Sequence, residues 1–294
     1  MTGAANLRGQ LYDFRRRHGR SATSRKMARG IRALGVYSGD VVIAHTSLRK
    51  VGKVRGGPEA LIKALRKAVG SKGTICMPAH SYGHEDPIFY SGPVPELSDV
   101  ERMRAAVAPF DPRTSPTTGM GVVAETFRQL PGVRRSPMPL GIAALGPAAE
   151  YITATQSLDD PQGLESPVGR IYALGGKALL IGVKLDRDTT LHVAEALANT
   201  PWQRRGRVHL TSGWTDYTAR LNCGNSFWRI EPVLHERGLI TYGRVGRARS
   251  MCISVRDSVD LAAQLLMSEP GYFLCTVGTC HACDAARPRA QSGM

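Results

Sequence analysis

The residues most capable of catalysis lie in the stretch from Asp188 to Glu195, which follows a hydrophobic run at residues 178–183. The run is typical of a buried strand, and the residues from Ala194 onward have the composition of a helix. His192 lies between the two, and histidine is the side chain that most readily accepts and returns a proton near neutral pH. Because α/β folds place their chemistry in loops at the carboxyl ends of strands, this position favours a general base.

An imidazole that acts as a base needs an orienting partner and donors for the negative charge that develops in the reaction. Glu195 lies three residues after His192, so on a helix the two side chains share a face. Asp188 is the alternative acidic partner, and Thr190 is the candidate donor to an oxyanion. A structural histidine and a solvated glutamate are the alternative interpretations of these positions.

Length, charge and composition restrict the classes of protein that the chain can belong to. Its 294 residues are 42% hydrophobic, which suits one large α/β domain or two smaller ones. A net charge of +15 favours polyanionic partners, but the arginines are scattered and no nucleic-acid-binding motif is present. We therefore expect no nucleic-acid partner. Since no apolar leader or long apolar run occurs, we also expect no membrane partner and a soluble, cytoplasmic protein.

Hydrophobic periodicity predicts the order of the elements. We expect an N-terminal helical segment at 7–35, strands at 41–44, 73–77, 142–145 and 178–183, and helices at 59–69, 121–130, 147–156, 166–172 and 258–267. Residues 79–118 lack clear periodicity, which is typical of a functional loop or lid. The pattern predicts one α/β domain over 1–283, with a central mixed sheet flanked by helices, and a disordered tail over 284–294.

Small hydroxyls and glycines follow the first expected strand. His45-Thr46-Ser47 ends that strand, and Gly56-Gly57 precedes the helix at 59–69. Backbone amides at the positive end of a helix can hold a pyrophosphate. The spacing matches neither a Walker loop nor a dinucleotide fingerprint, and a plain turn is the alternative.

Several of these segments, taken in order over residues 30–270, closely resemble the aminoglycoside 3-N-acetyltransferase family. The resemblance rests on 43–48, Gly56-Gly57, 73–78, 110–116, 166–170 and 189–195. It implies a fold unrelated to the common GNAT acetyltransferases, acetyl coenzyme A as the cofactor, and an amine as the acceptor. By this resemblance His192 would be the general base, and the coenzyme A site would be lined by Thr46, Ser47, Arg55, Gly56, Gly57, Thr114, Ser115 and Gly121.

The chemistry of acetyl transfer is compatible with these residues. Transfer from a thioester to an amine needs a deprotonated amine and a donor to the oxyanion, and Thr190 is the candidate for the second role. An acyl enzyme would need a nucleophile such as a cysteine, and the one cysteine in these motifs, Cys76, has the pattern of a buried strand residue. Direct transfer in a ternary complex is therefore favoured.

The acceptor itself is less defined than the reaction. A polycationic aminoglycoside needs acidic residues near its site, and Glu85, Asp86, Asp111 and Glu231 are available for this role. Tyr82 is a further candidate for contact with the substrate. Many family members carry an acidic residue where this chain has Asn222 to Phe227. A biosynthetic acyltransferase that modifies another amine, such as an amino sugar, peptide or nucleotide intermediate, is therefore the alternative. The sequence leaves a homodimer open.

Three cysteines crowd the carboxyl terminus. Cys275, Cys280 and Cys283 include a Cys-x-x-Cys pair, and either Cys223 or Cys252 is available as a fourth ligand to zinc. Free thiols are the default interpretation in a cytosolic chain.

Overall fold

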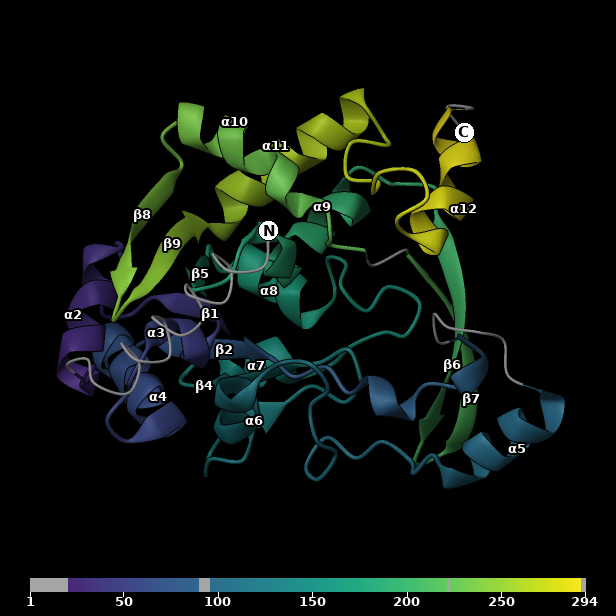
Figure 1. The fold of residues 1–294 in the computed structure, drawn as a ribbon, viewed down its shortest axis with the longest axis horizontal. Helices are drawn as coiled ribbons and strands as arrows, with labels where there is room; N and C mark the ends of the chain where they lie inside the picture. The colour runs from purple at the N-terminus through teal and green to yellow at the C-terminus, as the bar shows by residue number, and fades with distance from the viewer. Residues whose placement is uncertain (1–20, 90–95, 221–222, 292–294) are drawn as a thin grey trace, which may run out of the picture.

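The computed structural model describes residues 21–89, 96–220 and 223–291, which fold around one mixed sheet (Figure 1). Its seven strands lie in the order β3-β4-β2-β1-β5-β9-β8. Their bounds are Val41–Thr46 for β1, Thr74–Pro78 for β2, Arg134–Arg135 for β3, Ile142–Leu145 for β4, Lys177–Ile181 for β5, Ile240–Val245 for β8 and Ala248–Ser254 for β9. The predicted α/β fold with a central mixed sheet is confirmed.

The centre of the sheet is parallel. Ile43 of β1 pairs with Cys76 of β2 on one side and with Ala178 of β5 on the other. β4 and β9 join this trio in antiparallel orientation. The carboxyl ends of β2, β1 and β5 therefore meet at one edge of the sheet. Because β2 and β5 lie on opposite sides of β1, this edge is a topological switch point, the usual place for a site in such sheets.

Helices cover both faces of the sheet, which explains why its central strands are almost uniformly apolar. Val42 and Ala44 of β1 pack into one helical layer, and Ile43 packs into the other. The first layer holds α2 (Ser24–Ala33), α3 (Leu48–Val51), α4 (Gly57–Val69) and α6 (Val122–Arg128). The second holds α7 (Ala149–Thr153), α8 (Pro167–Ala173), α9 (His192–Leu197), α10 (Glu231–Glu236) and α11 (Val255–Ser268).

Local sequence signals explain where several helices begin. Gly56, with a φ of +85°, turns the chain into α4, and Pro58 lies in the first turn of that helix. Ser166 and Ser254 each accept a hydrogen bond from the backbone N–H three residues later and so cap α8 and α11. The helices expected from periodicity are confirmed with shifted ends, although residues 1–20 of the expected N-terminal segment lie outside the described ranges.

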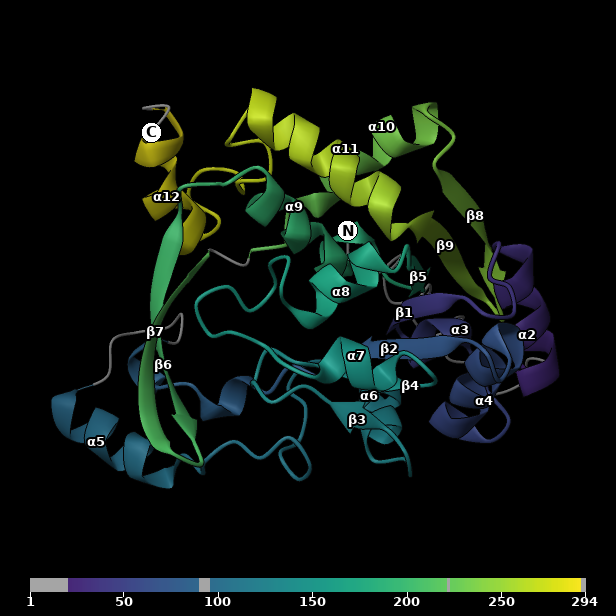
Figure 2. The same cartoon turned by 180° about the vertical axis from the view of Figure 1, so that it is seen from behind.

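A separate hairpin of β6 (Gln203–Leu210) and β7 (Gly213–Arg220) stands beside the main sheet, as both views show (Figures 1 and 2). The described parts of the 79–118 loop run along β6: Glu85 forms a bridge with Val208, and Phe110 with Leu210. This loop contains the 3-10 turns η1 (Tyr82–His84) and η2 (Pro87–Phe89) and the helix α5 (Leu97–Ala106). The loop is thus attached to the hairpin through its backbone.

The carboxyl-terminal segment differs from the expected disordered tail. Helix α12 extends over His281–Gln291, and residues 292–294 lie outside the described ranges. Cys283 and Ala286 of this helix are buried with Trp202 and Leu274 in a small apolar cluster. In the described part of the chain, no helix is long and apolar enough to cross a membrane.

Candidate active site

A cavity of about 370 Å³ opens at the edge of the sheet where β1, β2 and β5 end. Each of the three strands, or the loop that follows it, contributes polar groups to the wall. The wall includes Ala44, His45, Thr46, Pro78, His80, Tyr82, Asp186, Arg187, Asp188, Thr189 and His192, together with Gly119, Met120, Gly121, Gln162, Arg204, Gly224, Asn225 and Phe227. The parallel strands thus bring together residues that are far apart in the sequence.

His192 lies in this wall and contacts Glu195, which is buried outside the wall. His192 is the first residue of α9, and its Nδ1 lies 2.8 Å from Oε2 of Glu195. The ring of His192 also lies 4.8 Å from that of Phe227, centroid to centroid. Burial raises the pKa of Glu195, and the neighbouring His192 counteracts this rise. The predicted contact is therefore present, and the geometry leaves Nε2 of His192 as the ring nitrogen available to a ligand.

Thr190, the expected donor to an oxyanion, does not face the cavity. It is fully buried outside the cavity wall, and both its hydroxyl and its backbone N–H donate to Oδ1 of Asp188, at 2.6 and 3.0 Å. Because these donors are engaged, Thr190 orients Asp188 and has no free donor for an oxyanion. Thr189, which precedes it, lies in the wall of the cavity.

Two further histidines were not singled out as catalytic by the sequence. Burial, followed by repulsion from a neighbouring histidine, lowers the pKa of both His45 and His80 to about 3, so both rings are neutral at physiological pH. Within the described ranges, Nε2 of each ring and Oδ2 of Asp188 are buried without a hydrogen-bond partner. Such unpaired polar atoms beside a cavity are available to a ligand. The sequence did carry a signal for them, since both follow or end parallel strands.

The residues expected to bind coenzyme A fall into separate places. Thr46 and Gly121 lie in the cavity wall. The remaining expected residues lie outside it: Ser47 at the start of α3, Arg55, Gly56 and Gly57 at the start of α4, and Thr114 and Ser115 in the 79–118 loop. Ser115 is buried, and its hydroxyl accepts from the N–H of Asp111.

Most of the residues expected to contact the substrate form hydrogen bonds or ion pairs outside the cavity. Tyr82 lies in the cavity wall, but Glu85 accepts a hydrogen bond from Arg204 at 3.1 Å, and Asp86 from Arg104 at 2.7 Å. Asp111 pairs with backbone and side chain of Arg113, and Glu231 accepts from Tyr242. None of these four acids lines the cavity. The acidic residues in its wall are Asp186 and Asp188, which lie in the same loop as His192.

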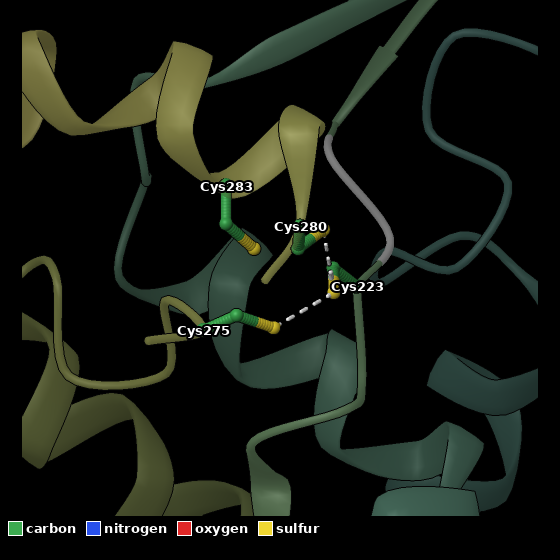
Figure 3. A group of neighbouring side chains, drawn as sticks. All are labelled: Cys223, Cys275, Cys280 and Cys283. Atoms are coloured by element: carbon green, nitrogen blue, oxygen red, sulfur yellow. Dashed lines mark hydrogen bonds between the residues drawn. The ribbon is translucent and has the colours of Figure 1, made fainter. Parts of the chain in front are cut away.

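The three carboxyl-terminal cysteines lie together with Cys223. The four sulfur atoms are all within 4.8 Å of one another (Figure 3). Cys252, the other residue considered as a fourth ligand, lies in β9 and is not part of this group.

A cavity at the switch point of a mixed sheet, with a histidine in its wall that contacts a buried glutamate, is typical of an α/β enzyme. Comparison with known proteins gives the particular family. A family model described as aminoglycoside 3-N-acetyltransferase matches residues 43–267. Aminoglycoside N(3)-acetyltransferase IV of Salmonella sp is 38% identical over 246 residues, covering 82% of this chain and 86% of the relative. The chain belongs to the aminoglycoside 3-N-acetyltransferase family and is an N-acetyltransferase.

Solved structures agree with this assignment. The aminoglycoside acetyltransferase AAC(3)-IVa, as apoenzyme, superposes with a TM-score of 0.79 at 35% identity, over 92% of this chain and 99% of that one. A mutant of that enzyme in complex with a gentamicin gives a TM-score of 0.78, with 92% and 98% covered at 35% identity. A binary complex of AAC-IIIb with CoASH gives 0.73 at 28% identity, with 85% and 97% covered. The predicted family and its fold are confirmed.

Proposed function

We propose that this chain transfers the acetyl group of acetyl coenzyme A to an amino group of an aminoglycoside or a related amino-containing small molecule. The observation that carries the proposal is the contact of His192, which lies in the wall of the cavity, with the buried Glu195. The structure of AAC-IIIb with CoASH and that of the AAC(3)-IVa mutant with a gentamicin support the two ligands.

His192 is the proposed general base. Glu195 accepts the hydrogen bond of Nδ1–H, which fixes the tautomer that has a lone pair on Nε2. His192 then takes a proton from the acceptor amine at Nε2 while the amine nitrogen attacks the thioester carbon. A carbon–nitrogen bond forms, the carbon–sulfur bond breaks, and the imidazolium returns its proton to the departing sulfur. The proton balance closes without an acyl enzyme, so direct transfer in a ternary complex is sufficient.

One carboxylate of the cavity is left for a cationic acceptor. Of the two in the wall, Asp186 pairs with Arg187 at 3.4 Å, whereas Asp188 has no arginine partner in the described ranges. Arg204, which also reaches the wall, is paired with the buried Glu85. Burial raises the pKa of Asp188, and a bound ammonium group would stabilise its charged form. An amino group of the acceptor would therefore find Asp188 as an acidic partner close to His192.

The first test replaces the base. In His192→Ala we expect acetyl transfer, measured as release of coenzyme A thiol, to fall by about 10²–10⁴-fold, the usual contribution of general base catalysis. Binding of acetyl coenzyme A, measured by calorimetry, should change little. His235→Ala, on the exposed part of α10, is the matched control and should keep the wild-type rate. Wild-type turnover in His192→Ala would refute the role of His192.

A second measurement addresses the acceptor. Thiol release is followed with a panel of amines that includes aminoglycosides, amino sugars, peptides and amino nucleotides. We expect the highest kcat/KM with the aminoglycosides. A clear preference for another amine would retain N-acetyl transfer and overturn the acceptor.

A further inference from the structure

The four cysteines Cys223, Cys275, Cys280 and Cys283, here called the cysteine cluster, come from three separate segments of the chain (Figure 3). Cys223 lies between β7 and the 3-10 turn η5 (Phe227–Ile230), and Cys275 lies in the loop after α11. Cys280 and Cys283 lie at the start of α12, and their sulfur atoms point toward the other two. The tertiary fold therefore joins the Cys-x-x-Cys pair and the nearby Cys275 with Cys223, which is distant in sequence.

The distances between the sulfur atoms suit a metal better than a disulfide. Sγ of Cys223 lies 3.6 Å from Sγ of Cys275 and 3.8 Å from Sγ of Cys280. A disulfide requires a sulfur–sulfur distance of about 2.0 Å. A zinc–thiolate bond of about 2.3 Å places the corners of a regular tetrahedron about 3.8 Å apart. Two of the sulfur–sulfur distances thus match a Cys₄ zinc site, and all four sulfur atoms lie within 4.8 Å of one another.

The backbone around the cluster has the compact turns that such a site needs. Gly278, at a φ of +79°, lies in the turn between Cys275 and Cys280, and its N–H donates to the side chain of Asp284 at 3.0 Å. The N–H of Asp284 in turn donates to the carbonyl of Cys280. Arg287 donates to the carbonyl of Cys275. These bonds fix the loop against the first turn of α12 and hold its thiols on one side.

The apolar packing beneath the cluster is small. Trp202, Leu274 and Ala286 are the buried hydrophobic residues that accompany Cys275 and Cys283 there. A core of this size supplies little free energy for holding α12 and the loop before it, whereas zinc bound to four thiolates contributes folding free energy directly.

We propose that Cys223, Cys275, Cys280 and Cys283 bind one structural zinc ion, which anchors the segment that carries part of the active-site wall. Gly224 and Asn225, which follow Cys223 directly, line the cavity, as does Phe227, whose ring contacts that of His192. Cys223 and Cys283 also line a small cavity together with Glu195. The four thiolates leave no coordination position for a substrate, so the ion acts through position alone.

The metal site is tested by metal content, which does not depend on the proposed acetyl transfer. The full chain, free of a histidine tag, is purified in reducing buffer without chelator, and its metals are measured by mass spectrometry. We expect about one zinc per chain, and less than about 0.2 in Cys223→Ser and in Cys280→Ser. Cys252→Ser, which changes a buried thiol of β9 outside the cluster, is the matched control and should keep its zinc.

Because a cysteine variant can fail to fold, the wild-type protein is also tested directly. Replacement of the metal by cobalt(II) should give the intense charge-transfer absorption of tetrahedral thiolate coordination. Removal of zinc by a chelator should lower the melting temperature and kcat, and stoichiometric zinc should restore both. Wild-type protein with neither zinc nor the cobalt spectrum would overturn the proposal. One iron per chain in place of zinc would overturn the identity of the ion.

Discussion

The carboxylate of Glu195 is the group whose removal tests the proposed catalytic pair most sharply. Glu195→Gln keeps the size of the side chain and an oxygen that can accept from Nδ1–H of His192, and it removes only the charge. Glu195 does not touch the substrate in our proposal. Its role is to position the imidazole and to stabilise the imidazolium that forms when the amine loses its proton.

The size of the effect follows from the geometry of the pair. The contacting atoms are 2.8 Å apart and both side chains are buried, so the centres of charge lie about 4 Å apart. At an effective dielectric constant of about 20, two unit charges at this separation attract each other by about 4 kcal/mol. Each 1.36 kcal/mol corresponds to about a tenfold change in rate, so kcat should fall by about 10³-fold.

The assay compares kcat and KM of wild type, Glu195→Gln and the control Glu236→Gln, which alters an exposed carboxylate at the end of α10. Thiol release is measured across a range of pH at saturating acetyl coenzyme A. We expect the loss in kcat, little change in the KM for acetyl coenzyme A, and an acidic limb of the pH profile that moves to lower pH. A merely structural glutamate would not move that limb.

One result would refute this reasoning. If Glu195→Gln retains kcat within about threefold of wild type, with an unchanged melting temperature and pH profile, the charge of Glu195 does not stabilise the imidazolium. The buried glutamate would then be neutral in the working enzyme, as its raised pKa permits, and the mechanism would need another partner for His192.

Two further predictions concern groups around the site. Asp86→Asn should lower the free energy of unfolding by about 3 kcal/mol in urea titrations, because it leaves Arg104 without its buried partner, and it should leave the KM for the amine unchanged; the exposed Asp99→Asn is the control. Burial, then His192, lowers the pKa of His80 to about 3, so the unfolded chain binds a proton below pH 6.5 that the native chain rejects. Stability should therefore be fully present above pH 6.5 and fall toward pH 3, with a smaller fall in His80→Gln.

A different result would contradict each of these two predictions. An Asp86→Asn variant with unchanged stability and a raised KM for the amine would return that carboxylate to the substrate site. Equal loss of stability in wild type and His80→Gln between about pH 7.5 and about pH 5 would show that His80 is not the residue that resists protonation.

Local patterns predicted the parts of the site that depend on neighbours in sequence. The apolar runs at 41–44, 73–77 and 178–183 indicate strands of a sheet that is buried on both faces. Because a helix brings residues three apart onto one face, the spacing of His192 and Glu195 was enough to predict their contact, which the structure contains. The position of the pair after a strand likewise indicated the edge of the sheet where the cavity lies.

The same reasoning could not assign the acids of the long loop. Glu85 and Asp86 have the composition of a site for a cation, yet each is neutralised by an arginine distant in sequence, Arg204 or Arg104. The Glu85 pair depends on how β6 of the hairpin packs against the loop, and the Asp86 pair depends on how α5 folds back onto the start of the loop. Sequence spacing carries no information on that contact.

From the sequence alone, strand and helix periodicity predicted the fold class, the resemblance of ordered motifs predicted the family, and the three-residue spacing predicted the contact of His192 with Glu195, because such patterns encode local geometry directly. Only the tertiary structure decided which distant residues share a space. It placed Asp186 rather than Glu85 in the cavity wall, engaged Thr190 with Asp188, and chose Cys223 over Cys252 beside the carboxyl-terminal cysteines. Those choices follow from the packing of segments that meet only when the whole chain has folded.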